Sequence, residues 1–403
     1  MAIAVGVKKL LVYKKETTWG TAAGASGANY LRRVTSDIDL TKDTYQSNEI
    51  ASHQQIVDFR HGVKRVAGGI QAELSTATYA PFLAALCRKD FAAGVSFTSG
   101  GGSEITSQSA GPSFTRASGS WLTDGFKVGD VVRVTNHSTA ANNNKNYRIV
   151  TLTATVMTVA ESVVTDATPD ATCTIAVTGK KTYIPTTGHT DDSFTIEHYY
   201  SDLDISEQFL GCKPSSVALS LPPTGMATAN FSFMGQDRVV TSGGSSPYFS
   251  SPTADTSTGV LAAVNGTIRV GSTDLAIVTG LTINLESTLT GDPVVGSNIL
   301  PILAQGRVRV TGQATLYFQD TTYLDAFNNE TEMAMYCKLD QAGTDPKSFL
   351  NIVIPRIKLG GASKDDGEKA LVQTIPFQAL LNSTGGAGTS SEKTTMSIQD
   401  SDA

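Results

Sequence analysis

The sequence predicts an all-β protein that consists of two tandem β-sandwich domains, each with a short helix, and a small β domain inserted into the first. Three observations support this prediction. The composition favours strands and turns, many segments alternate between apolar and polar residues, and the second half of the chain repeats the order of elements of the first.

The composition indicates the class of protein. Hydrophobic residues account for 40% of the 403 residues, which is enough to bury a core and excludes a disordered chain. Charged residues account for 17%, below the ~25% that is usual in globular domains. Long surface helices need many Lys and Glu residues, so this balance favours short strands and turns. The length indicates two or three domains.

Strands are predicted where apolar and polar residues alternate, because successive side chains of a strand point to opposite faces of its sheet. The alternation is present near residues 38–40, 70–74, 217–221, 229–233, 281–285, 308–316 and 350–354. Two segments favour a helix instead. Residues 79–87 carry Pro81 in the first turn, where its missing N–H costs little, and residues 322–328 form the second.

A constant offset relates the two halves of the chain. The segment GVKRVAG at 62–68 aligns with GRVRVTG at 306–312, an offset of 306 − 62 = 244. The same offset, with a one-residue slip upstream, aligns further positions: Ile38 with Ile283, Leu40 with Leu285, Leu74 with Phe318, Thr78 with Thr322 and Tyr79 with Tyr323. Downstream, LSLP at 219–222 resembles IVIP at 352–355. We interpret this as one β domain duplicated in tandem, since the repeat is too long for a solenoid; chance similarity is the alternative.

The repeat defines the expected domains. The first is discontinuous, with residues 1–92 and 180–250, and the second comprises residues 251–383. Between the two parts of the first lie about ninety residues without a counterpart in the second, so residues 93–179 are expected to form a small inserted β domain. Residues 384–403 are rich in Ser, Thr and Gly. We expect them to be a flexible tail, or to add a strand to a neighbouring subunit.

Charge and targeting signals narrow the possible partners. The net charge is −6 and no basic stripe could neutralise phosphates, so tight nucleic-acid binding is not expected. The N-terminal MAIAVGVKK carries its lysines after a short apolar run, unlike a signal peptide, and no run approaches the ~20 residues of a membrane span. We expect folding in the cytosol, with buried free thiols at the four cysteines.

No catalytic, cofactor or metal site is predicted. The five histidines are scattered without an H-E-x-x-H pattern, and no G-x-S-x-G or G-x-G-x-x-G motif occurs. The stretch GKKT at 179–182 lacks a phosphate-binding loop's first glycine, since Thr174 stands in its place. The acidic pairs at 191–192 and 365–366 are typical of exposed turns, without the further oxygen ligands that calcium requires.

Short motifs resemble those of the major tail tube proteins of long-tailed (siphovirus-type, non-contractile) bacteriophages. They cover most of the chain outside the insert: YKKETTWGT at 13–21, YQSNEI at 45–50, DFRHG at 58–62, GGIQAEL at 68–74, SLPPTGMA at 220–227, FMGQD at 233–237, NETE at 329–332 and PFQA at 376–379. The resemblance implies tail-tube-type β-sandwich domains, with a long hairpin that lines a tube. Subunits would close rings, and rings would stack around a channel for DNA.

The resemblance also implies which residues face the channel and which reach the next ring. The implied lining residues are Asp37, Asp39, Lys64, Gln71, Glu73, Asn284, Arg309 and Gln313. The implied inter-ring loop contains Tyr45, Asn48, Glu49, Asp58 and Arg60. A tandem chain supplies two ring units, so three chains would supply the six units of a ring with pseudo-sixfold symmetry. A trimer is therefore expected rather than a hexamer. The inserted domain would face outward.

Partners and location follow from the same resemblance. We expect self-association into stacked rings, contacts with the tape measure protein, the tail terminator and the distal tail or baseplate proteins, transient non-specific passage of DNA during genome ejection, and no membrane binding. The protein would be assembled in the host cytoplasm and reside in the virion. The inner tube of a contractile tail and other virion structural proteins remain alternatives. A β-sandwich adhesion module is disfavoured, because only two tryptophans are present and a signal peptide is missing.

Overall fold

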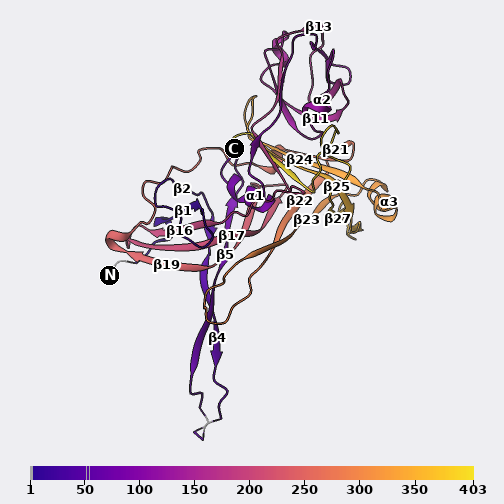
Figure 1. Ribbon diagram of the computed structural model, residues 1–403. Coiled ribbons are helices and arrows are strands. Elements are labelled where there is room, and N and C mark those ends of the chain that lie inside the picture. The colour runs from indigo at the N-terminus through magenta and orange to yellow at the C-terminus, as the bar shows by residue number, and fades with distance from the viewer. Residues whose placement is uncertain (1–2, 51, 54) are drawn as a thin grey trace.

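The computed structural model describes the whole chain except residues 1, 2, 51 and 54. Among the described residues, strands form one sheet of 20 strands and a second sheet of eight. The larger sheet folds into two sandwich units, and the smaller one makes up the inserted domain at the top of Figure 1. The predicted all-β class is confirmed.

Two layers make up the first unit. One layer pairs β2, β1, β16, β17 and β19 in that order, and the other pairs β4, β5, β18 and β17. Its strands are Lys9–Lys15 (β1), Asn29–Tyr30 (β2), Thr35–Ser36 (β3), Asp39–Gln46 (β4), Phe59–Glu73 (β5), Ala92–Ala93 (β6), Lys180–Tyr183 (β15), Phe194–Tyr200 (β16), Ile205–Leu221 (β17), Thr228–Gly235 (β18) and Asp237–Ser242 (β19). β17 belongs to both layers, because its first half pairs with β16 and β19 and its second half with β18.

The second unit has the same connectivity. One layer pairs β21, β20, β24, β25 and β28, and the other pairs β22, β23, β27 and the end of β25 together with β26. Its strands are Gly266–Val270 (β20), Thr273–Leu275 (β21), Val278–Thr290 (β22), Ala304–Tyr317 (β23), Met333–Asp340 (β24), Phe349–Leu359 (β25), Ser363–Lys364 (β26), Val372–Ala379 (β27) and Ser397–Asp400 (β28). Short 3₁₀ turns lie at Gly6–Lys8, Ala140–Asn142, Gly243–Ser245 and Ala263–Asn265.

A buried helix fills the first unit between its layers. α1 (Ala80–Cys87) begins after Tyr79, with a proline in its first turn, and ends where Arg88 adopts a left-handed conformation. The ring of Phe82 lies 4.9 Å from that of Tyr13 on one layer and 5.2 Å from that of Phe233 on the other. α3 (Thr322–Asn328) follows β23 as α1 follows β5, but it is mostly exposed. The helix between the layers therefore contributes to one core far more than to the other.

The two units share one continuous sheet, which we call the junction sheet. Its strand order is β4, β5, β18, β17, β22, β23, β27 and then the end of β25 with β26. The units join between β17 and β22, where residues 216–221 pair antiparallel with residues 281–286. On the buried face, one row of directly opposed side chains crosses the join: Ile70, Phe231, Val217, Leu285 and Val310. A single hydrophobic core therefore extends across both units.

Strand registers in the two units correspond. Asp39 lies opposite Ala67, as Asn284 lies opposite Thr311, which matches the offsets seen in the sequence. Further along, Pro214 pairs with Phe233 and Ala218 with Asn230; the corresponding pairs are Leu359 with Phe377 and Ser363 with Thr374. In both cases four residues on one strand span three on the other, so both units carry the same bulge.

This register corrects the downstream part of the sequence alignment. Ala218 and Leu219 correspond to Ser363 and Lys364, so the expected match of 219–222 with 352–355 is wrong. Residues 350–353 belong to the other layer, where they pair with β24 and β28. The resemblance between LSLP and IVIP reflected only the alternation that buried strands have in common.

The inserted domain is a separate β structure with its own core. Its strands are Ser96–Thr98 (β7), Ile105–Gln108 (β8), Ser113–Arg116 (β9), Val131–Thr135 (β10), Asn146–Leu152 (β11), Val156–Val159 (β12), Asp166–Asp170 (β13) and Thr174–Val177 (β14), with a helical turn at Trp121–Asp124 (α2). They pair among themselves in the order β13-β8-β9-β12-β11-β10-β14-β7. Trp121 and Phe126 are fully buried at its centre, with ring centroids 5.2 Å apart.

The C-terminal segment is part of the body of the protein. β28 lies between β25 and β15, pairing with both, and Met396 and Ile398 are buried in the main core. The expectation that residues 384–403 form a flexible or inter-subunit tail is therefore wrong. All four residues of β28 are buried and paired with neighbouring strands. This strand orders the otherwise polar segment within its own chain.

The core can be tested by comparing neighbouring residues on opposite faces of β18. Phe231→Ala removes a ring that contacts Tyr79 and Phe82 and leaves a cavity, so we expect a loss of about 3–5 kcal/mol in the free energy of unfolding. Asn230→Ala changes an exposed side chain on the same strand and should stay within about 0.5 kcal/mol. Denaturant unfolding of both variants measures the difference; equal losses would contradict the assigned faces.

Candidate functional site

The exposed face of the junction sheet is polar along its whole width. Alternation places side chains there that are small or uncharged except for Glu73, in rows that run from strand to strand. One row contains Gln71, Asn230, Ala218, Asn284, Thr311 and Gln378, and the next contains Glu73, Thr228, Ser220, Thr282, Gln313 and Pro376. No aromatic residue and no Lys or Arg belongs to these two rows. Such a face offers few groups that could hold a polyanion or an apolar ligand.

Charged residues gather toward the hairpin end of this face. A third row contains Gly69, Ser232, Ser216, Glu286 and Arg309, and Arg65 pairs with Asp43 at 2.8 Å. Both signs are present, so the face has no basic stripe. Pairs of this kind are exposed and contribute little stability.

The structure places most of the expected lining residues together. Gln71, Glu73, Asn284, Arg309 and Gln313 all lie on the polar face, in the rows described above. Asp37 and Asp39 share the alternation of that face. The Asp37 carboxylate accepts a hydrogen bond from the Gly69 amide at 2.5 Å. Asp39 lies at the sheet edge, where its carboxylate is 2.7 Å from Arg238 of β19.

Lys64 was wrongly included among the lining residues. It lies on the same side of β5 as the buried Val66, and its ammonium is 3.1 Å from the Asp237 carboxylate of β19. β5 keeps a regular register from Lys64 to Glu73, so Lys64 lies on the opposite side of the strand from Gln71 and Glu73. Sequence reasoning also missed the contribution of β17 and β18 to the face, namely Ser216, Ala218, Ser220, Thr228 and Asn230. Their position between buried apolar residues was the available signal.

Both edges of the junction sheet are open. β4 pairs with β5 on one side, and in the described part of the chain no strand pairs with its other side. β26 and the last residues of β25 likewise pair only with β27, as far as the structure describes the chain. An open edge presents unpaired N–H and C=O groups, which favour pairing with another chain.

At the join inside the chain, the edge of β17 pairs with the edge of β22. The open edges of β4 and β26 have no such partner in the described chain. At the join, Ala218 of β17 lies opposite Asn284 of β22. By the corresponding registers, Ser363 of β26 occupies the position of Ala218, and Asp39 of β4 occupies that of Asn284. Each chain therefore carries one closed join and, at its two ends, the two halves of another.

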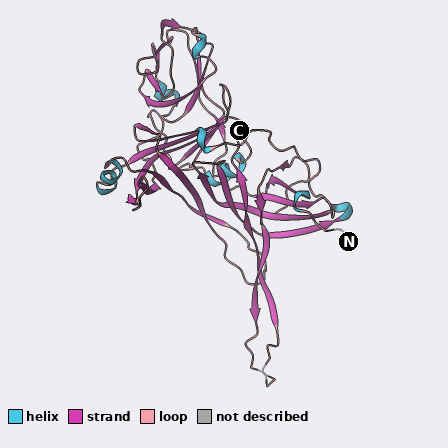
Figure 2. Ribbon diagram, turned by 180° about the vertical axis from the view of Figure 1, so that it is seen from behind, coloured by secondary structure: helices cyan, strands magenta, loops and turns pink. Residues whose placement is uncertain are grey.

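The hairpin between β4 and β5 extends away from the body, as Figures 1 and 2 both show. Tyr45 and Arg60 lie opposite each other on its strands, and Asn48, Glu49 and Asp58 are exposed beyond them. Large apolar side chains are exposed on the same hairpin: Tyr45, Ile50, Ile56, Val57 and Phe59. Of these, the family resemblance assigned only Tyr45 to the inter-ring loop. Exposed apolar groups gathered on a projecting segment are typical of an interaction site.

The corresponding loop of the second unit does not project. Residues 291–303 fold back along β5, where the Lys64 amide donates to the Asn298 carbonyl at 2.8 Å. Leu300 and Leu303 pack with Val63 in a small core cluster. Of these two corresponding segments, as far as the structure describes them, the one between β4 and β5 projects and the other does not.

His198 and the four cysteines are buried in the interior of the protein. His198 is packed against Phe209 and bonded to Ser36 at 2.9 Å, and burial lowers its pKa to about 3. Burial raises the pKa of Cys87, Cys173 and Cys337 to about 12 and that of Cys212 well above its usual value. Among the residues that the structure describes, no group of His, Cys, Asp and Glu could hold a metal ion, and no helix is long and apolar enough to cross a membrane.

The buried thiols should be unreactive. A thiol reagent at pH 8 is expected to label none of the four cysteines in the folded protein and all of them after denaturation, because only exposed thiolates react. Ser363→Cys, at an exposed position, should be labelled at once. Mass spectrometry measures the number of labelled thiols. Rapid labelling of the folded, unsubstituted chain would contradict the burial of its cysteines.

Comparison with known proteins adds an identification. No curated protein matches the chain. The family described as "Phage tail tube protein" matches residues 6–379, which is nearly the whole sequence. The chain therefore belongs to the phage tail tube protein family, whose members are structural components of the virion.

Proposed function

We propose that this protein forms the tail tube of a long-tailed, non-contractile phage, in which three copies close each ring and the stacked rings conduct the genome during ejection. Membership of the tail tube family supports the structural role. The observation that carries the ring is the match between the closed join β17–β22 and the open edges of β4 and β26. Both units would descend from one duplicated domain.

Pairing between copies would satisfy both edges at once. Placing Ser363 of one chain opposite Asp39 of the next reproduces the register of Ala218 and Asn284. Repeating this step around a closed ring leaves no edge unpaired, which is the physical advantage of a barrel. The β26 edge of each copy would meet the β4 edge of the next copy. Because two different surfaces are in contact, the interface is heterologous, and rotation about one axis closes the ring.

The size of such a ring fits its cargo. Each chain contributes eight strand positions to the junction sheet, so three copies give 3 × 8 = 24 strands. With strands about 4.8 Å apart and a tilt of about 40°, the barrel would be about 48 Å across between backbones. That leaves room for a DNA duplex after side chains are added. The polar rows would face it without retaining it.

Stacking would use the projecting hairpins. Three copies would present three hairpins, with Ile56 and Phe59 among the exposed apolar side chains that contact the next ring. Tape measure, terminator and distal tail proteins would be the further partners, and assembly would take place in the host cytoplasm. The inserted domain would face outward; it lies at the opposite end of the molecule from the hairpin (Figure 1).

Disulfide trapping tests the proposed ring contact. In the double variant Asp39→Cys with Ser363→Cys, oxidation should link neighbouring chains into closed trimers, because directly opposed strand residues lie within disulfide reach. The buried native cysteines do not interfere. Non-reducing electrophoresis and electron microscopy of the rings give the readout.

A matched control fixes the register. Thr374 lies directly opposite Ser363 on the neighbouring strand, so Asp39→Cys with Thr374→Cys separates the thiols by two strand spacings, about 10 Å. This is beyond disulfide reach, and we expect no linkage. Equal linkage in both pairs, or none in the first pair within assembled rings, would contradict the proposed contact.

The hairpin can be tested separately from the ring. Replacing Ile56 and Phe59 by Ser should leave single rings intact but shorten or abolish tubes, because the apolar contact between rings is lost. Val164→Ser, an exposed apolar position on the inserted domain, is the control and should leave tube length unchanged. Negative-stain length distributions measure the effect. Normal tubes from the double Ser variant would rule out this role of the hairpin.

A further inference from the structure

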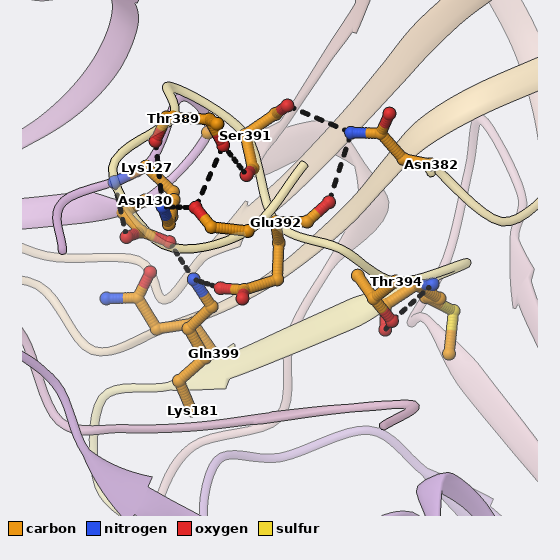
Figure 3. Close-up of polar contacts among 12 residues, drawn as sticks. Lys127, Asp130, Lys181, Asn382, Thr389, Ser391, Glu392, Thr394 and Gln399 are labelled. Atoms are coloured by element: carbon orange, nitrogen blue, oxygen red, sulfur yellow. Dashed lines mark hydrogen bonds and ion pairs between the residues drawn. The ribbon is translucent and has the colours of Figure 1, made fainter. Parts of the chain in front are cut away.

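The base of the inserted domain and the C-terminal segment meet on the second unit. The insert leaves the chain from the first unit, between β6 and β15, yet it rests against β24 and β25 of the second. The segment 382–400 runs along this contact and ends in β28 (Figure 3). We infer that these parts form a brace, which locks the two units at one angle so that each chain enters a ring as a rigid pair. This inference rests on the proposed ring.

β28 provides the backbone link of the brace. On one side it pairs with β25 of the second unit, and on the other with β15 of the first. Just before it, the Thr394 hydroxyl donates to the Ile184 carbonyl at 2.9 Å, and the Ile184 amide donates to the Met396 carbonyl at 3.1 Å. The two units are thereby connected a second time, in the layer opposite the join β17–β22.

A nearly buried charge network holds the segment against the insert. The Lys181 ammonium lies 2.5 Å from the Asp130 carboxylate and 3.2 Å from that of Glu392. The Lys127 ammonium donates to the carbonyls of Gly386 and Thr389 at 2.6 and 2.8 Å. Figure 3 shows these groups converging from three segments of the chain. Breaking one partner of such a network leaves an uncompensated charge, so its geometry is strongly specified.

Gln399 completes the contact with amide hydrogen bonds. Its carbonyl oxygen accepts from the Val131 amide at 2.9 Å, and its amide group donates to the carbonyls of Val131 and Thr178. The Gln399 side chain is thus bonded to β10 and to the residue that follows β14, while its own backbone is part of β28. It is 2% exposed, so water does not compete for these bonds.

The second unit contributes its own contacts to the base of the insert. The Asn351 side chain donates to the Gly129 carbonyl at 2.9 Å, and Arg148 forms an ion pair with Asp274 at 2.6 Å. Gly129 has a positive φ of +91°, and a Cβ there would lie 2.7 Å from the Tyr336 ring. The insert therefore approaches β24 more closely than any residue larger than glycine at position 129 would permit.

The open ends of the chain have no equivalent of this brace. β19 occupies in the first unit the place that β28 occupies in the second, and in the described residues its outer side has no partner strand. The segment of the second unit that corresponds to β15, between α3 and β24, consists of residues 329–332 and forms no strand. In the proposed ring, joins within chains would be braced and joins between chains would not. Ring curvature would then be set inside each chain before assembly.

Two brace variants and a control on the same segment test the inference. Gln399→Ala removes three hydrogen bonds, and Lys127→Met removes two while keeping the aliphatic stem. Lys393→Ala changes an exposed residue of the segment and is the control. In the unassembled full-length chain, hydrogen exchange of the amides at 382–400 should be at least tenfold faster in both brace variants and unchanged in the control.

The same variants are then assembled and viewed end on. The brace predicts a mixture of open and differently sized rings for Gln399→Ala and Lys127→Met, and uniform rings for the control. Faster exchange with uniform rings would overturn the role in curvature, and unchanged exchange would overturn the brace itself. If the unaltered protein forms no rings, the proposed function fails, whereas the exchange experiment still decides whether the brace holds the two units.

Discussion

The pairing between β17 and β22 is the contact on which the rest of the structure depends. Backbone N–H and C=O groups at a sheet edge must find partners, and six residues on each strand provide them here. Because the pairing is antiparallel and in register, the apolar rows of both units meet on one face and the polar rows on the other. A slip of one residue would place Leu219 and Ile283 in water. The join therefore fixes both the shared core and the continuous polar face.

The same constraint applies to the two ends of the sheet, where nothing in the described chain closes the edge. Natural proteins protect open edges with charges, bulges or covering loops. Here β4 is long and β26 is short, and their registers match those of the closed join. Membership of the phage tail tube protein family and an edge geometry that repeats the join already present in the chain both support the proposed ring.

The sequence predicted the all-β class because alternation of period two is long and regular around Ile70, Leu219 and Ile283. The family resemblance implied Gln71, Glu73, Asn284, Arg309 and Gln313 as one set, and all five lie on the polar face of the folded sheet. It failed at Lys64, where a polar residue stands on the core side and is satisfied by Asp237, which only the folded chain brings near.

Other misses have the same physical origin. Residues 352–355 alternate like 219–222 but lie in the other layer, because strand pairing over long separations decides the layer and alternation does not. The C-terminal segment is polar in composition, yet Thr394, Gln399 and Asp400 are buried with partners far away in the sequence. Burial of Asp400 raises its pKa to about 6, which a short polar sequence does not reveal.

The number of chains per ring tests the central claim most directly. Native mass spectrometry of single rings should give three times the chain mass of 42.3 kDa, or 3 × 42.3 = 126.9 kDa, because each chain supplies two units and two open edges. End-on averages of the same rings should show threefold symmetry, with three inserted domains at the periphery. A ring of six chains, or a chain that remains monomeric at high concentration, would contradict the account.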